Sequence, residues 1–343
     1  MGSLFQGQLK VDPSFSEQGL IVTYTQRSGA FAALPGEVPK VKLGSEDLNV
    51  YINGLDLRTE AQAAQASSNF LPSSTLVGSY YSTAAYLIRT RASWDHHDIA
   101  AAANYNVSLP AAQDLASRQG IFQQMRTMLL YGLQPANGEG LVNAVNATQV
   151  TLPPDTYGND TVLTYDNGEM ALFILSQIVA IKDAMYQTGG DITNKIKVIS
   201  PQRIFVQFEY GSVVQTTSYQ RPGAGTATIG QEIKQIMQEH GDSIDWYYDD
   251  TLIGKGAGGS DLVILTIPEI EVPMIEGINT NEFGKIEPSI KDVNTMYTDM
   301  AAPMKIPTPV PDGGITEVQE LRCTSGWNLR GQGLFLLNMP YSA

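Results

Sequence analysis

The chain has 343 residues, of which 43% are hydrophobic and 16% charged, a composition typical of a folded protein. Its 35 acidic and 21 basic residues give a formal net charge of −14. This charge argues against a dedicated nucleic-acid-binding protein, because such proteins present a basic surface. One cysteine, Cys323, excludes an intramolecular disulfide framework, and we expect it to be an unreactive buried or edge thiol. The longest apolar stretch, 170–181, is interrupted by polar residues, so we expect no transmembrane helix.

Glycine, proline and polar residues alternate through the first 45 residues, where Leu34-Pro35-Gly36 and Val38-Pro39 interrupt any long element. This pattern predicts an extended arm with few core side chains. Two strand-like runs follow, 48–52 and 78–91, separated by a polar segment from Arg58 to Asn69. They predict a hairpin with a long tip, and a mobile surface loop is the alternative.

Next, the sequence predicts a short helix from Asp95 to Asn104 and a long helix that Ser108 caps and Gly132 ends. Residues at helical spacing predict the buried stripe of the long helix: Ala112, Leu115, Ala116, Phe122, Met125 and Leu129. Asp114 and Arg118 stand four apart and should form an ion pair. A turn follows from Asn137 to Asn143.

The middle region, 164–273, alternates helix and strand. Asn167 is the predicted cap of a helix with an apolar stripe formed by Met170, Phe173, Ile174, Ile178, Ile181 and Met185. Strands are predicted at 195–200, 244–248 and 262–267, with a second amphipathic helix at 229–240. The last predicted strands, 316–323 and 334–337, should return to the sheet beside the long helix.

The succession from Tyr86 to Ala144 resembles that of the major capsid proteins of tailed bacteriophages, which have the Hong Kong 97-type coat fold. The match includes the turn ending in Gly140, Leu141 and Asn143, and it continues through the Ser200-Pro201 step, the helix at 229–240 and the strand that ends near Pro268. It extends from about residue 75 to the C-terminus. Its evidence is the order and spacing of elements, so it is an argument by fold analogy.

The resemblance implies an α+β fold with five parts. These are an N-terminal arm (1–45), an extension-loop hairpin (46–93), a peripheral domain with the long spine helix (94–163), an axial domain (164–273) and a C-terminal return to the peripheral domain (274–343). In that family the hairpin reaches over a neighbouring subunit, and the axial domain surrounds the symmetry axis of the capsomer.

By the same resemblance, the chain is a structural protein rather than an enzyme. It would assemble with itself into pentamers and hexamers of an icosahedral shell around double-stranded DNA, which it touches weakly and without specificity. Other implied partners are a portal protein and possible scaffolding and decoration proteins, with no membrane. The implied location is the virion capsid, assembled in the bacterial cytoplasm. Two alternatives stay open: an encapsulin-like nanocompartment shell and a cytosolic α/β enzyme.

Three groups of residues are candidate chemical sites. The run from Gly254 to Ser260 contains Lys255 but lacks the spacing of a phosphate-binding P-loop, so we expect a flexible turn between strands. The run Asp95-His96-His97-Asp98 places its histidines on different sides of a helix, which favours helix capping over metal binding. The third group has no nucleophile and is expected to be a solvated charged face: His240, Asp242, Asp245, Asp249 and Asp250. We therefore predict no catalytic, cofactor-binding or metal-binding residue.

Overall fold

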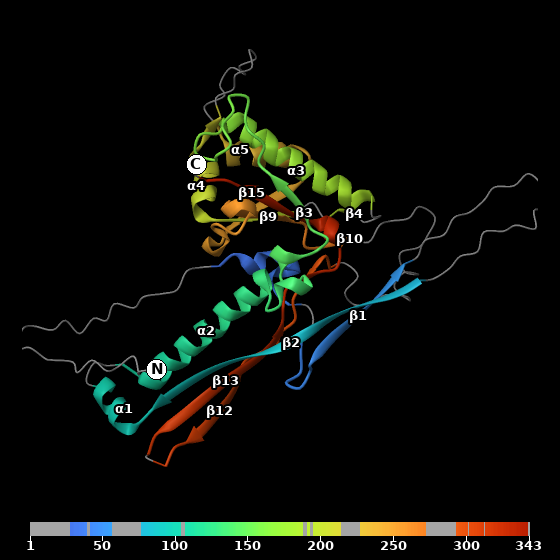
Figure 1. Cartoon of the computed structure of the whole chain (residues 1–343). Coiled ribbons are helices and arrows are strands. Elements are labelled where there is room, and N and C mark those ends of the chain that lie inside the picture. Colours follow the sequence, from blue (N-terminus) through green and yellow to red (C-terminus); the bar gives the residue numbers. More distant parts are fainter. Residues whose placement is uncertain are drawn as a thin grey trace, which may run out of the picture.

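The computed structural model describes residues 28–39, 42–56, 77–103, 107–187, 191–192, 195–213, 227–271, 293–300, 302–311 and 313–341. The described chain forms two layered parts (Figure 1). In one, a long helix lies along a four-stranded sheet. In the other, three helices cover one face of a five-stranded sheet. None of the helices in the described residues combines the length and apolar character needed to cross a membrane.

The four-stranded sheet has the order β1 (Asn49–Asp56), β2 (Val77–Trp94), β13 (Ile315–Thr324), β12 (Met304–Pro309), and all neighbours are antiparallel. Strand β2 is 18 residues long because it serves two partners in succession. Its residues 77–84 pair with β1, whereas residues 85–94 pair with β13. The predicted hairpin and the predicted return of residues 316–323 are both confirmed. The hairpin tip, Arg58 to Ser74, lies outside the described residues.

Two helices follow β2, as predicted: α1 (His96–Ala103) and α2 (Leu109–Tyr131). Asp95 and Asp98 cap α1 reciprocally, since the Asp98 N–H donates to Asp95 Oδ1 at 2.8 Å and the Asp95 N–H to Asp98 Oδ2 at 3.2 Å. Ser108 stands at the N-cap of α2, but its side chain makes no capping hydrogen bond. Gly132 ends α2 with φ 66°, a conformation that favours glycine.

The predicted buried stripe of α2 is wrong for most of its members. The side chains that face the sheet and core are Leu109, Ser117, Ile121, Met128, Leu129 and Leu130. Leu115 and Phe122 are 53% and 45% exposed, and Ala112 and Ala116 are exposed as well. Of the predicted set, Leu129 is buried and Met125 packs against the core while partly exposed.

The five-stranded sheet has the order β3 (Thr148–Thr151), β15 (Leu334–Met339), β9 (Asp261–Thr266), β5 (Lys195–Ser200), β8 (Ser243–Tyr248). The pairs β3–β15 and β5–β8 are parallel, and the two pairs that involve β9 are antiparallel. One face is covered by α3 (Asn167–Gln187), α4 (Gln202–Tyr210) and α5 (Ile229–Glu239). Three two-residue ladders complete the described structure: β4 (Asp191–Ile192) with β10 (Ile270–Glu271), β6 (Ser212–Val213) with β7 (Ala227–Thr228), and β11 (Thr295–Met296) with β14 (Trp327–Asn328).

Alternate residues of the central strands fill two different cores. Val198, Val263 and Leu337 face α3 to α5, whereas Ile199, Ile264 and Leu336 face the end of α2.

The predicted apolar stripe of α3 is confirmed at all six positions. Its cap lies one residue earlier than predicted, because Asp166 Oδ1 accepts the N–H groups of Gly168 and Glu169 at 2.9 and 3.0 Å.

The predicted destination of residues 334–337 is wrong. They form β15, which lies between β3 and β9 in the five-stranded sheet, rather than in the four-stranded sheet along which α2 lies. The run Leu334-Phe335-Leu336-Leu337 is buried on both faces, and such a run belongs in the centre of a sheet covered on both sides.

The predicted arm is also wrong for its described part. Residues 28–39 form two short 3-10 helices, Ala30–Ala33 and Pro35–Glu37, between the two parts of the molecule (Figure 1). Ala30, Ala33 and Leu34 are almost completely buried in the same core as the end of α2. Removal of residues 1–40 would therefore open this core.

The corrected orientation of α2 can be tested with two neighbouring substitutions. Ile121→Asp places an unpaired charge in the core and should cost about 3–5 kcal/mol or more, enough to abolish cooperative folding. Phe122→Asp should lose only the ring contact with Phe31, about 1 kcal/mol. Thermal unfolding by circular dichroism would measure both. A soluble Ile121→Asp variant alongside an unfolded Phe122→Asp variant would restore the original stripe.

Candidate functional site

Glu139, in the turn after α2, joins segments that are far apart in the sequence. Its carboxylate accepts hydrogen bonds from Tyr86 Oη at 2.7 Å, Ser325 Oγ at 2.9 Å and the Gln134 N–H at 3.0 Å. Burial raises the pKa of Glu139, but these donors outweigh it and hold the pKa below its ordinary value. Burial and the same contact raise the pKa of Tyr86 to about 12. One carboxylate thus ties β2 and the end of β13 to the end of α2.

The motif residues of this turn have structural roles. Gly140 has φ 87°, and a Cβ atom there would lie 2.3 Å from the carbonyl carbon of Tyr131. The side-chain amide of Asn143 donates to the carbonyl oxygens of Tyr131 and Glu139, at 2.8 and 3.1 Å. Leu141 is fully buried. The turn therefore closes the C-terminal end of α2, whose last carbonyl groups need partners.

A second junction fastens the five-stranded sheet to α2. Tyr131 Oη, at the end of α2, donates to the carbonyl oxygen of Thr251 at 2.7 Å. Asp249 is completely buried and accepts the hydroxyls of Ser28 and Thr251, each at 2.5 Å, and the Thr251 N–H at 3.0 Å. These hydrogen bonds, two from nearby Thr251 and one from distant Ser28, offset the cost of burying the carboxylate.

Glu37 provides a further contact between residues 28–39 and the sheet. It is the non-glycine residue with positive φ (62°) in the described part of the chain. Its carboxylate accepts Tyr247 Oη at 2.6 Å and lies 3.4 Å from Lys197 Nζ. The hydrogen bond from Tyr247 lowers the pKa of Glu37, and the same bond raises that of Tyr247 to about 12.

The acidic group near His240 is not the solvated face that we expected. Asp242 is buried in an ion pair with Lys182, and Asp249 holds the junction described above. Asp250 accepts the Gln202 N–H at 2.8 Å at the start of α4. Asp245 and His240 are exposed. Each of the first three acids completes a structural contact, and the five residues do not form one site.

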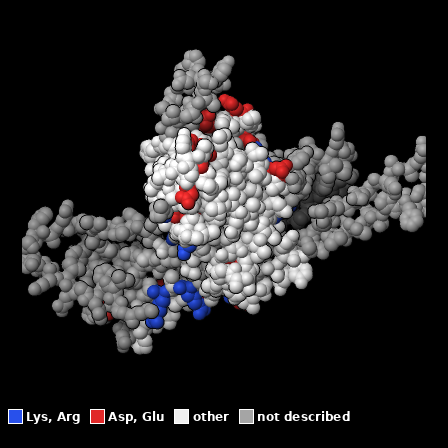
Figure 2. Space-filling view, turned by 45° about the horizontal axis from the view of Figure 1, so that its top comes forward, with Lys and Arg blue, Asp and Glu red and all other residues white. Residues whose placement is uncertain are grey.

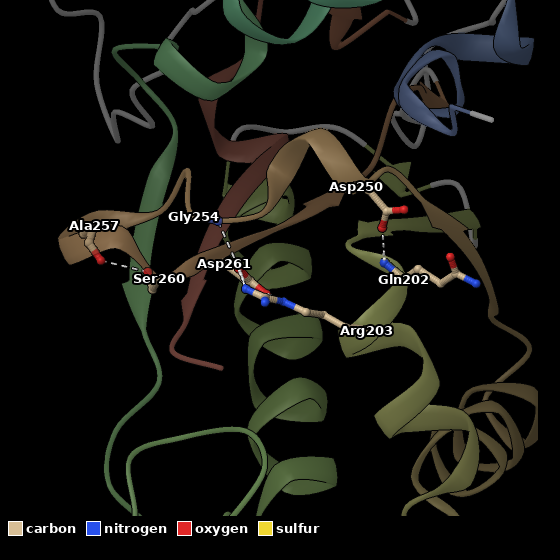
Figure 3. A network of polar contacts seen from close by, with 7 residues as sticks. All are labelled: Gln202, Arg203, Asp250, Gly254, Ala257, Ser260 and Asp261. Atoms are coloured by element: carbon tan, nitrogen blue, oxygen red, sulfur yellow. Dashed lines mark hydrogen bonds and ion pairs between the residues drawn. The ribbon is translucent and has the colours of Figure 1, made fainter. Parts of the chain in front are cut away.

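The glycine-rich run from Gly254 to Ser260 is a turn between strands, as predicted, but it is tied down rather than loose (Figure 3). Buried Asp261 accepts the Gly254 N–H at 3.0 Å, while Arg203 binds the same carboxylate through two nitrogens at 2.6 and 2.5 Å. Asn338 Oδ1 accepts the Ala257 N–H at 2.8 Å. Lys255 Nζ lies 5.6 Å from the centre of the Tyr131 ring, and this cation–π contact adds to the junction with α2.

The two histidines that follow Asp95 stack on each other, with ring centroids 3.9 Å apart. Within the described residues, no group of three or more histidine, cysteine or acidic side chains has metal-binding geometry. Cys323 is fully buried, and burial raises the pKa of its thiol to about 11. The reciprocal capping of α1 by Asp95 and Asp98 and the burial of Cys323 agree with the structural roles predicted for Asp95 and Cys323.

The surface of the five-stranded part carries scattered acidic side chains and large uncharged areas (Figure 2). Exposed positions of α5 are polar, as on an ordinary amphipathic helix: Gln231, Lys234, Gln235, Gln238 and Glu239. On α3, by contrast, Leu172 and Val179 are 67% and 66% exposed. Tyr51 and Tyr80, on the two-stranded part of the hairpin, are 65% and 73% exposed. Exposed aliphatic and tyrosine side chains are common where proteins contact other proteins.

No protein-family model and no curated protein sequence matches the chain. Among solved structures, the capsid of Myoviridae phage XM1 is similar over 95% of this chain and 96% of that one, with TM-score 0.68 and 9% identity. The capsid of cyanophage P-SCSP1u is similar over 100% and 96%, with TM-score 0.55 and 9% identity. The capsid of the native GTA particle covers 98% and 97%, with TM-score 0.55 and 10% identity. These matches confirm the predicted α+β, Hong Kong 97-type fold.

The junction at Glu139 should make stability depend on pH. Because its pKa is lowered in the folded state, its stabilisation is present above the ordinary pKa of glutamate, about 4.3, and is lost as the pH falls through the folded value. Glu139→Gln should destabilise the protein by about 2 kcal/mol at pH 7. Urea unfolding at several pH values should show this difference shrinking below about pH 4.

Exposed Glu46 provides the control, because Glu46→Gln should change little at any pH. An equal loss of stability for Glu139→Gln at pH 3 and pH 7 would show that the carboxylate charge is not what holds the junction.

Proposed function

We propose that this chain is the major capsid protein of a tailed bacteriophage and that it assembles with itself into an icosahedral shell around double-stranded DNA. The observation that carries the proposal is the agreement of fold over nearly the whole length of both chains, 95% and 96% for the phage XM1 capsid. A match over both full lengths covers the body and its appendages, rather than one common domain.

The exposed surfaces of the chain support self-association. Leu172 and Val179 form an aliphatic face on α3, and the hairpin exposes Tyr51 and Tyr80. We infer that the five-stranded part packs around the axis of a capsomer and that the hairpin, 46–93, reaches a neighbouring copy. Each contact can be modest, because a closed shell repeats it many times.

The proposed partners follow from the same model. The acidic balance of the chain suits weak, non-specific contact with packaged DNA, since strong phosphate binding would hold the genome to the wall. A portal protein and possible scaffolding and decoration proteins would complete the virion. Assembly would take place in the bacterial cytoplasm.

Electron microscopy of the purified protein tests the proposal directly, and closed shells, tubes or capsomer rings are the expected result. A uniformly monomeric protein at high concentration, with or without co-expressed phage proteins, would contradict it. Nuclease treatment of particles from infected cells separates a capsid from the encapsulin-like alternative. Protected DNA supports the capsid, and protected cargo protein supports the nanocompartment.

A substitution on α3 should separate assembly from folding. Leu172→Asp changes an exposed side chain, so its effect on the melting temperature should be small, but it places a charge in the inferred contact and should reduce assembly at least about ten-fold. Gln238→Asp, on the exposed polar face of α5, is the matched control and should assemble normally. Sedimentation velocity measures both, and equal assembly of the two variants would remove α3 from the contact surface.

Deletion of the hairpin tip, Arg58 to Ser74, tests the inferred reach of the hairpin. The polar tip sequence has few core-type residues, so the deletion should leave the folded subunit intact while it weakens closure of the shell. Circular dichroism reports the fold and sedimentation reports closure. Full-sized shells with the stability of the unaltered protein would show that the tip bridges nothing.

A further inference from the structure

Strand β12 is the outer strand of the four-stranded sheet and lies at the margin of the part that contains α2 (Figure 1). All six of its residues are exposed, and Lys305 is the single charged one. Met304 and Ile306 are 42% and 38% exposed. An exposed edge strand with little charge offers its free backbone groups to a strand of another molecule, so natural proteins block such edges.

Hydrogen bonds between β12 and β13 fix which backbone groups of β12 point away from the sheet. The Val310 N–H donates to the Gly314 carbonyl oxygen at 2.8 Å, in register with the β12–β13 ladder. In an antiparallel pair, the N–H and C=O groups of successive residues point alternately toward the partner strand and away from it. Even-numbered residues of β12 therefore bond β13, and the backbone groups of Lys305, Pro307 and Pro309 point outward.

Proline occupies most of these outward positions. Pro307 and Pro309 have no N–H, so Lys305 is the one outward residue of β12 that can donate a backbone hydrogen bond. Pro303 and Pro311 continue the same alternation on either side of the strand. The other three strands of this sheet, β1, β2 and β13, contain no proline. The outer edge of β12 thus keeps its carbonyl oxygens as acceptors while most of its donors are missing.

The prolines remove most of the hydrogen bonds that two copies could form edge to edge. In an antiparallel pair of β12 strands, three outward residues of each copy would face the other copy, which gives six N–H groups if none is proline. With Lys305 as the one donor in each copy, two remain. The unpaired carbonyl groups would lose water without gaining a partner, which is costly. In addition, the Lys305 ammonium group already pairs with Asp114 of α2.

We propose that the alternating prolines of β12 exclude backbone pairing between copies of this chain at that edge. A protein that assembles in many copies needs such an exclusion, because pairing of exposed strands would compete with its ordered contacts. The inference goes beyond the proposed function, since it concerns a contact that the subunits avoid. It applies to the subunit whether or not shells form.

A double substitution, Pro307→Thr with Pro309→Thr, tests the proposal, because it restores two outward N–H donors in each copy without adding a large apolar side chain. Neither proline supplies a ladder hydrogen bond, so far-UV circular dichroism should be unchanged and the melting temperature should fall by no more than about 4 °C. Self-association, measured by sedimentation velocity, should be at least about ten-fold tighter than for the unaltered protein. Hydrogen exchange should show protected amides at positions 307 and 309.

The matched control is Met304→Thr with Ile306→Thr, which introduces the same residue type into the same strand at positions whose backbone groups point to β13. This control should associate no more than the unaltered protein. Thr308→Pro checks the register, because it removes an inward N–H and should lower the melting temperature more than Pro307→Thr does.

Unchanged sedimentation of the double variant, with rapid exchange at positions 307 and 309, would overturn the proposal. Association without protection at these positions would place the new contact on another surface and would also overturn it. If the double variant does not fold, the single variants Pro307→Thr and Pro309→Thr repeat the measurement. Unfolding of both single variants would show that the prolines serve the fold of the subunit itself, contrary to the proposal.

Discussion

The hydrogen bonds that satisfy the last carbonyl groups of α2 hold the two parts of the molecule together. A helix ends with carbonyl groups that have no partner inside the helix. Here the Met128 carbonyl accepts the N–H groups of Gly132 and Gly326, both at 3.1 Å, and the Tyr131 carbonyl accepts Asn143. Gly326 can approach because it lacks a side chain, since a Cβ atom there would lie 2.1 Å from the Leu129 carbonyl oxygen. The helix end thereby fixes the end of β13 and the turn that carries Glu139.

Sequence patterns gave the right answer where a helix has one partner. The stripe of α3 is correct throughout, because α3 packs on one sheet face and its apolar side is the buried side. In α2 the same reasoning selected Leu115 and Phe122, which lie on one line with buried Leu129 but are themselves exposed. Periodicity shows that positions share a face, but it does not show how far along the helix that face meets the core.

Contacts between distant segments were beyond prediction from one sequence. The strand character of residues 334–337 was evident, but its neighbours in the sheet, β3 and β9, lie far away in the chain. The segment Ala30 to Leu34 is too short and too closely followed by Pro35-Gly36 to show a period, so its burial left no signal. Glu139 was missed because an acid between two glycines in a turn usually faces water. Nothing local indicates the donors Tyr86 and Ser325.

The division of β2 between two partners has a mechanical consequence. From residue 85 onward the strand is held by β13 and by α2, whereas residues 77–84 pair with β1, whose Val50 and Ile52 pack against Val293 and Met296. A two-stranded ribbon twists more freely than a wider sheet. Its eight paired residues extend about 25 Å from the point where β13 ends. The buried contact of Val50 and Ile52 places the pivot of the ribbon at Ile52 and its partner Tyr81. The four residues beyond Ile52 extend about 13 Å, so a bend of about 10° at that point displaces the end of the ribbon by about 2 Å.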